Sequence, residues 1–151
     1  MSALQAENLK KAIWDIDLSM VISKMMNSHG WSKEDADEAC VLYRNYLFLL
    51  AKYPKKSLPP SQDIDEFWHN HILDTKKYRA ECDKIFGKYM DHKPSYFLEN
   101  KETEMKALES GFQETQRLHF EEFGEHIYEI RGPFKKLISG MKLLRNALLS
   151  N

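Results

Sequence analysis

The densest group of chemically reactive side chains lies in the segment from Asp65 to Asp74, which contains His69 and His71. Imidazole and carboxylate groups are the usual ligands of zinc and the usual acid–base catalysts. On a regular helix, however, side chains at positions i and i+2 point about 200° apart and do not hold one ion. The pair with helical ligand spacing is Asp65 and His69, at i and i+4. A metal site in which His69 and His71 bind the same ion is therefore disfavoured.

Angular positions separate an inward histidine from an outward one. The spacing predicts one helix over 63–86. At about 100° per residue, His71 lies about 60° from Trp68 on the apolar stripe, whereas His69 lies about 100° to the other side. Cys82 also falls on the apolar stripe, about 16 Å along the helix from His71. His71 and Cys82 are therefore predicted to face the core without sharing an ion directly.

An inward histidine needs a hydrogen-bond partner or a metal. Asp74 is placed to orient the ring of His71, and His92, in the loop after Gly87, can fold back toward either core-facing ligand. Two ligand sets stay open: His71 with His92 and a carboxylate, or Cys82 with His92 and a group from another helix. The candidate ligands are His71, His92, Cys82, His69 and Asp65, supported by Asp74, Trp68 and Tyr78. Zinc is the favoured ion, with copper and iron as alternatives.

A structural interpretation stands beside the chemical one. A single histidine on a helix core face is more often a hydrogen-bonded core residue than a ligand, and Trp68 is most simply a core anchor. A lone buried cysteine behaves as a small hydrophobic residue.

The helices that position these residues are marked by periodicity and by their ends. Apolar residues recur at spacings of three and four along most of the 151 residues. Ser2 and Ser32 are predicted N-caps, and Gly30 and Gly87 are predicted stops. We expect one all-α bundle of about five to six helices, with a long penultimate helix that continues to Ile130 and an amphipathic C-terminal helix. The helical domain that carries the Trp-His-x-His motif is predicted to span 1–132. His119 and His126 then share one face of the penultimate helix, most simply as packing residues.

The segment 133–151 is predicted to form a basic amphipathic helix, with its apolar face docked on the same domain. It has four cations and no acid, so it carries +4, and the remainder of a chain with net charge -1 carries -5. Contact with a protein partner or an anionic membrane surface is the alternative role of this helix. The cations that would make the contact are Lys135, Lys136, Lys142 and Arg145.

Composition narrows the class of protein. The chain is 42% hydrophobic and 30% charged, which is typical of a globular domain. The net charge argues against nucleic-acid binding by phosphate neutralisation. Three features predict a cytoplasmic protein. The chain has only two cysteines beside seven methionines, its N-terminus lacks a leader pattern, and it has no apolar run of about 20 residues.

The pattern as a whole resembles the glycine-rich domain-containing protein-like family. The matching residues run from Pro60-Ser61 through Trp68-His69-x-His71 and Cys82 to Phe86-Gly87, followed by Asp91-His92-x-Pro94. The likeness is to the short bacterial type of member, a domain of unknown function, whereas plant and fungal members are long. The resemblance implies an all-α domain and no settled activity. The long members' glycine-rich C-terminal region is missing here.

Three functions remain open at this point. The first is metal binding by an inward-facing His/Asp/Cys group. The second is a non-enzymatic interaction or membrane-surface module in which the motif is structural. The third is acid–base catalysis by His71 and Asp74, and it is the weakest because the chain has no nucleophile motif, phosphate loop or cofactor fingerprint. The balance leans against an enzyme.

Overall fold

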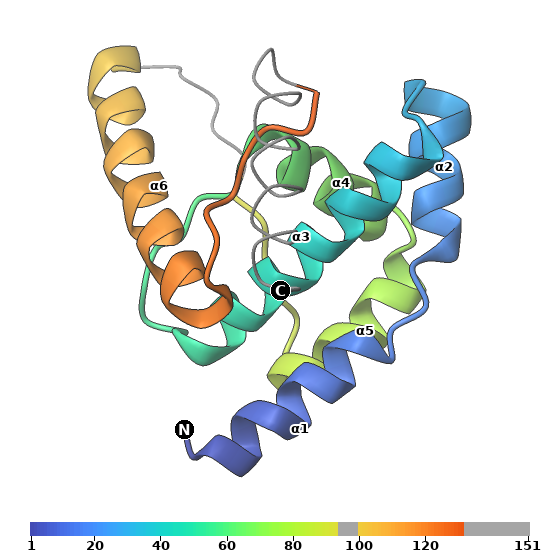
Figure 1. Cartoon of the computed structure of the whole chain (residues 1–151), viewed down its shortest axis with the longest axis horizontal. Coiled ribbons are helices and arrows are strands. Elements are labelled where there is room, and N and C mark those ends of the chain that lie inside the picture. The colour runs from blue at the N-terminus through green and yellow to red at the C-terminus, as the bar shows by residue number, and fades with distance from the viewer. Residues whose placement is uncertain (94–99, 132–151) are drawn as a thin grey trace, which may run out of the picture.

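The computed structural model describes residues 1–93 and 100–131 (Figure 1). Helices account for most of these residues and no strand occurs among them, which confirms the predicted all-α class. The six helices are α1 (Ala3–Trp14), α2 (Ser19–His29), α3 (Lys33–Lys52), α4 (Gln62–Ile72), α5 (Thr75–Phe86) and α6 (Lys101–Phe123). The predicted C-terminal helix lies outside the described residues.

Local signals set several of the helix boundaries. The hydroxyls of Ser2, Ser32 and Ser61 each accept a hydrogen bond from the backbone N–H three residues later. These bonds satisfy amide groups that have no partner inside the helix. Gly30 and Gly87 end α2 and α5, as predicted.

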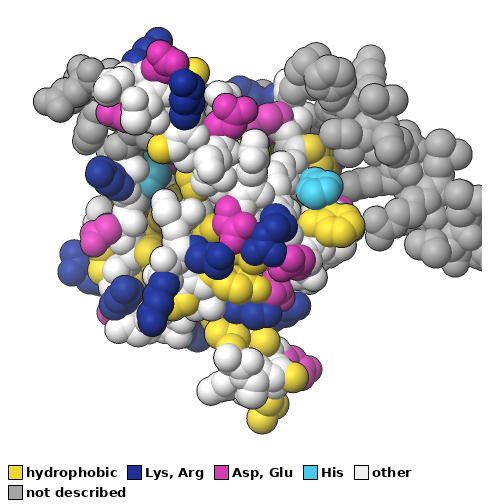
Figure 2. Space-filling view, turned by 90° about the vertical axis from the view of Figure 1, so that its left-hand side faces the viewer, with side chains coloured by type: hydrophobic (Ala, Val, Ile, Leu, Met, Phe, Trp, Pro, Cys, Tyr) yellow, Lys and Arg dark blue, Asp and Glu magenta, His cyan; other side chains and the backbone are white. Residues whose placement is uncertain are grey.

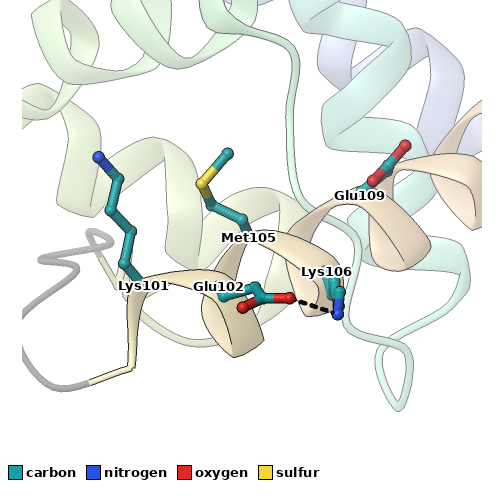
Figure 3. Close-up of a pocket in the computed structure, with 5 residues that line it drawn as sticks. All are labelled: Lys101, Glu102, Met105, Lys106 and Glu109. Carbon is teal, nitrogen blue, oxygen red and sulfur yellow. Dashed lines mark hydrogen bonds and ion pairs between the residues drawn. The ribbon is translucent and has the colours of Figure 1, made fainter.

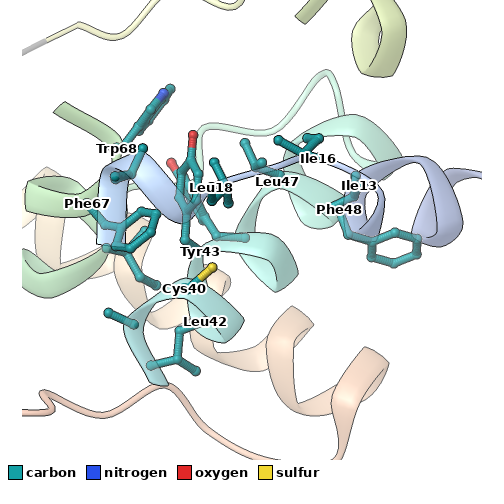
Figure 4. Close-up of a cluster of buried hydrophobic side chains, with 14 of the residues drawn as sticks. Ile13, Ile16, Leu18, Cys40, Leu42, Tyr43, Leu47, Phe48, Phe67 and Trp68 are labelled. Atoms are coloured by element: carbon teal, nitrogen blue, oxygen red, sulfur yellow. The ribbon is translucent and has the colours of Figure 1, made fainter. Parts of the chain in front are cut away.

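Helix α3 is the centre of the fold and packs against α1, α2, α4 and α6 (Figure 1). Ten of its 20 residues are buried, so neighbouring helices cover α3 along much of its length. Aromatic rings join it to α4: Tyr43 meets Phe67 with ring centroids 5.1 Å apart, and Tyr46 meets Trp68 at 5.5 Å. Figure 4 shows Tyr43, Phe67 and Trp68 within this cluster. The α3–α4 contact therefore fixes the helix that carries the histidine motif.

The prediction of a single helix over 63–86 was wrong. Helix α4 ends at Ile72, and Asp74 caps α5 with a non-helical backbone (φ -84°, ψ 69°). Asp74 makes no side-chain capping bond, so the break between the two helices lies in its non-helical backbone. Angles measured from Trp68 therefore do not extend to Cys82 or to other residues of α5.

The penultimate helix is shorter than predicted, because α6 ends at Phe123 rather than near Ile130. Gly124 adopts φ 74°, a left-handed conformation that side chains with a Cβ rarely adopt. Ile127 and Ile130 are nevertheless buried, from a non-helical segment. Their apolar spacing resembled a continued helix because both residues still face the core.

This non-helical segment, 125–131, is tied to the N-terminus of α4. The backbone N–H of Ile130 donates to Asp63 Oδ2 at 2.5 Å, and that of Gln62 donates to Glu129 Oε1 at 3.1 Å. Burial, with a hydrogen bond to Asp63 and the charge of that carboxyl, raises the pKa of Glu129 to about 7. The start of α4 is therefore held from the far end of the described chain.

Candidate metal centre

Two segments bring the ligand-type side chains together. Asp65 and His69 lie one turn apart on α4, so they point to the same side of the helix. The chain after Gly87 folds back across α4 and places His92 beside them. The site is thus made by one helix turn and one loop.

The donor atoms of these three residues converge. The Nε2 atoms of His69 and His92 are 2.7 Å apart, His92 Nε2 is 2.9 Å from Asp65 Oδ1, and His69 Nε2 is 3.6 Å from Asp65 Oδ2. One donor atom from each residue lies within 4.8 Å of the others. Zinc bonds of about 2.0–2.2 Å at tetrahedral angles put ligand atoms about 3.4 Å apart. Small side-chain shifts therefore suffice for the three residues to hold one ion.

Packing fixes the position of the His92 ring. Its ring stacks on Trp68, with centroids 4.3 Å and planes 27° apart, and its side chain is only 11% exposed. This burial lowers the pKa of His92, Asp65 acts in the opposite direction, and the neighbouring His69 lowers it further. A lowered pKa favours the neutral imidazole, which is the form that coordinates metals.

Trp68 and Tyr78 fix the loop that carries His92. Trp68 Nε1 donates to the hydroxyl of Tyr78 at 2.9 Å, and that hydroxyl donates to the carbonyl of Met90 at 2.8 Å. Burial raises the pKa of Tyr78, so its hydroxyl keeps the proton that it donates. One phenol therefore ties α4, α5 and the backbone two residues before His92.

His71 belongs to a different, buried assembly. Its Nδ1 lies 2.8 Å from the hydroxyl of Tyr43, and its Nε2 lies 2.5 Å from Glu81 Oε2. A carboxylate only accepts, so Nε2 of His71 donates to Glu81, and Nδ1 shares a hydrogen bond with the Tyr43 hydroxyl. Burial raises the pKa of Tyr43, which agrees with a protonated hydroxyl. This Tyr43–His71–Glu81 chain joins α3, α4 and α5.

The structure does not place the other core-facing candidates with the surface group. Cys82 is buried and lies against Tyr78 and the backbone of Met90, and burial raises the pKa of its thiol. Asp74 is exposed, and the second nitrogen of His71 is taken by Glu81 instead. Sequence reasoning missed Glu81 because the helix break changes which residues of α5 face α4.

The histidines of the later helix are also separated. His119 is buried, with Nε2 3.2 Å from Asn45 Nδ2 and Nδ1 2.6 Å from the carbonyl of Glu125. His126 lies beyond the end of α6 and stacks on Phe120 with centroids 4.8 Å apart. The prediction that both share one helix face was wrong, because Gly124 ends the helix between them.

The predicted partner contacts Lys135, Lys136, Lys142 and Arg145 lie outside the described residues. On the face drawn in Figure 2, the coloured basic and acidic side chains are interspersed rather than gathered by sign. Within the described part of the chain, no helix has the length and apolar character needed to cross a membrane.

A surface hollow runs along the first turns of α6 (Figure 3). Its lining residues are Lys101, Glu102, Met105, Lys106 and Glu109. Glu102 and Lys106 pair with each other at 2.7 Å. The hollow is therefore lined by solvated side chains of α6, and the charges of Glu102 and Lys106 already pair with each other.

Fold and site together define a small helical domain with a His/Asp group on its surface. A family model described as UCP032817-like matches residues 7–125, which is most of the chain. The protein therefore belongs to the UCP032817-like family.

Two relatives confirm the resemblance to glycine-rich domain-containing proteins. The Arabidopsis thaliana glycine-rich domain-containing protein 1 is 27% identical over 110 residues, which is 70% of this chain and 13% of the relative. Glycine-rich domain-containing protein 2 of the same plant is 28% identical over 96 residues, which is 61% of this chain and 12% of the relative. The matches thus span about an eighth of each relative. No solved structure matches the chain significantly.

Proposed function

We infer that this domain binds one divalent metal ion through Asp65, His69 and His92, with zinc the favoured ion. The observation that carries this inference is the convergence of three ligand-type side chains from two separate segments, with donor atoms 2.7–3.6 Å apart. In the absence of an ion, two imidazoles and a carboxylate can lie at these distances only when they share protons in hydrogen bonds. A metal would satisfy all three donors at once.

The donor set favours some metals over others. Two imidazole nitrogens and one carboxylate oxygen suit zinc, and they also suit iron and copper. Calcium and magnesium prefer sites made of oxygen ligands. The surrounding contacts also hold His92 in place, since Trp68 packs on its ring and Tyr78 bonds to the loop that carries it.

Zinc binding by the full chain, prepared without chelator, tests this function directly. Titration against a chromophoric chelator should show one zinc per chain. His69→Ala and His92→Ala should each weaken binding by about 100-fold or more, because each removes one of three ligands.

His126→Ala is the matched control, because it removes a surface imidazole outside the group and should bind zinc like the wild type. Circular dichroism should show unchanged helix content in all three variants. Equal zinc affinity in the wild type, His69→Ala and His92→Ala would overturn the proposed function.

A further inference from the structure

We propose that the ion held at this site keeps an exchangeable coordination position, and that this position takes a small carboxylate-type anion. The proposal rests on the proposed function and extends it from metal binding to ligand binding. Three observations carry it: the number of ligands, the side on which the site is open, and the charge of the loaded site.

The ligand count leaves a position free for exchange. Within the ranges 1–93 and 100–131, Asp65, His69 and His92 make up the whole group, and no fourth His, Cys, Asp or Glu joins it. Closed structural zinc sites use four protein ligands, whereas sites that exchange ligands use three. A zinc held by these three residues alone would therefore complete its tetrahedron with water or with an incoming ligand.

The free position faces solvent. The side chains of His69 and Asp65 are 49% and 36% exposed, while that of His92 is 11% exposed because Trp68 covers one face of its ring. Trp68 thus closes the inner side of the group and leaves the outer side open to solvent. A ligand can reach the ion without any movement of the core.

The charge of the loaded site selects an anion. A divalent ion with two neutral imidazoles and one carboxylate carries a net charge of about +1. The adjacent acid on α4, Glu66, is turned to His29, with Oε1 3.1 Å from Nδ1, and does not contact the group. A monoanion therefore neutralises the site, whereas a neutral molecule of the same shape gains no such attraction.

Cobalt(II) replacing zinc in the full chain tests the inference, because its visible absorption bands respond to changes in coordination. Saturation at one cobalt per chain is expected first, and its loss in His69→Ala confirms the ligands. Titration with acetate should then shift the bands in a saturable manner. Acetamide, the uncharged analogue, should bind at least about tenfold more weakly.

The outcomes separate the two proposals. Failure of the full chain to bind cobalt or zinc overturns the metal site itself. Stoichiometric cobalt whose spectrum does not respond to acetate leaves metal binding intact and overturns the exchangeable position. Equal responses to acetate and acetamide would overturn the charge argument, and with it the assignment of an anionic ligand.

Discussion

Replacing His71 by alanine should destabilise the fold strongly and leave zinc binding intact. His71 is only 2% exposed and joins the hydroxyl of Tyr43 to the carboxylate of Glu81. In His71→Ala both partners lose their hydrogen bond, and the space of the imidazole becomes a cavity between α3, α4 and α5.

The size of the loss follows from the exposure of each partner. The Tyr43 hydroxyl is fully buried, and an unpaired buried hydroxyl costs about 1–3 kcal/mol. The side chain of Glu81 is 15% exposed and can reach water, so its unpaired oxygen adds about 1 kcal/mol. The cavity adds about 1 kcal/mol. These terms overlap, so the expected loss is about 3 kcal/mol of unfolding free energy.

Urea unfolding of the metal-free chain in EDTA measures this loss. With an m-value of about 2 kcal/mol/M, the midpoint of His71→Ala should fall by about 1.5 M. His69→Ala is the matched control: its side chain is 49% exposed, and its midpoint should change by less than about 0.5 M. An unchanged midpoint in His71→Ala, or loss of zinc binding in that variant alone, would refute the division of roles between the two histidines.

Three further changes test other parts of the structure. The pKa of Glu129 is raised to about 7, so its stabilising contribution is full below its ordinary value near 4.5 and is lost as pH rises through 7. The unfolding free energy of the wild type should therefore fall between pH 5 and pH 8. In Glu129→Gln this fall should be smaller by about 1 kcal/mol, after allowance for the solvent exposure of Glu129. An unchanged pH dependence would contradict this. A Cβ at Gly111 would lie 2.8 Å from Cδ of Pro59. Gly111→Ala should consequently lower the unfolding free energy by about 1 kcal/mol despite the better helix propensity of alanine, and thermal melts that show a gain would refute the clash. Tyr78→Phe removes the bond to the Met90 carbonyl, so zinc affinity should fall by about tenfold, and an unchanged affinity in a folded variant would show that Tyr78 does not position His92.

Local chemistry made most of the helices predictable from the sequence. Ser2 and Ser32 cap helices as expected, and Gly30 and Gly87 end them. The two errors share one cause: apolar periodicity persists across a break when the residues beyond it still face the core. Ile130 keeps helical spacing after Gly124, and Tyr78 does so after Asp74.

The site could be predicted only in part. The helical spacing identified Asp65 and His69 as a pair, and the loop position of His92 made it available to fold back. The side of α4 on which His92 lies depends on tertiary contacts, and sequence spacing does not specify these. His92 lies on the outer side because Trp68 and Tyr78 hold its loop there, and Glu81 lies across the helix break from His71.

The opposite orientations of His69 and His71 make two properties of α4 separable by single substitutions. A relative that keeps histidine at position 71 and loses it at position 69 should retain the fold without the ligand group. The reverse change should be rarer, because it would demand compensation in both the partner tyrosine and the partner glutamate. Divergence within the family can therefore remove or restore the His/Asp group, and with it the proposed metal site, on a helix whose packing stays the same.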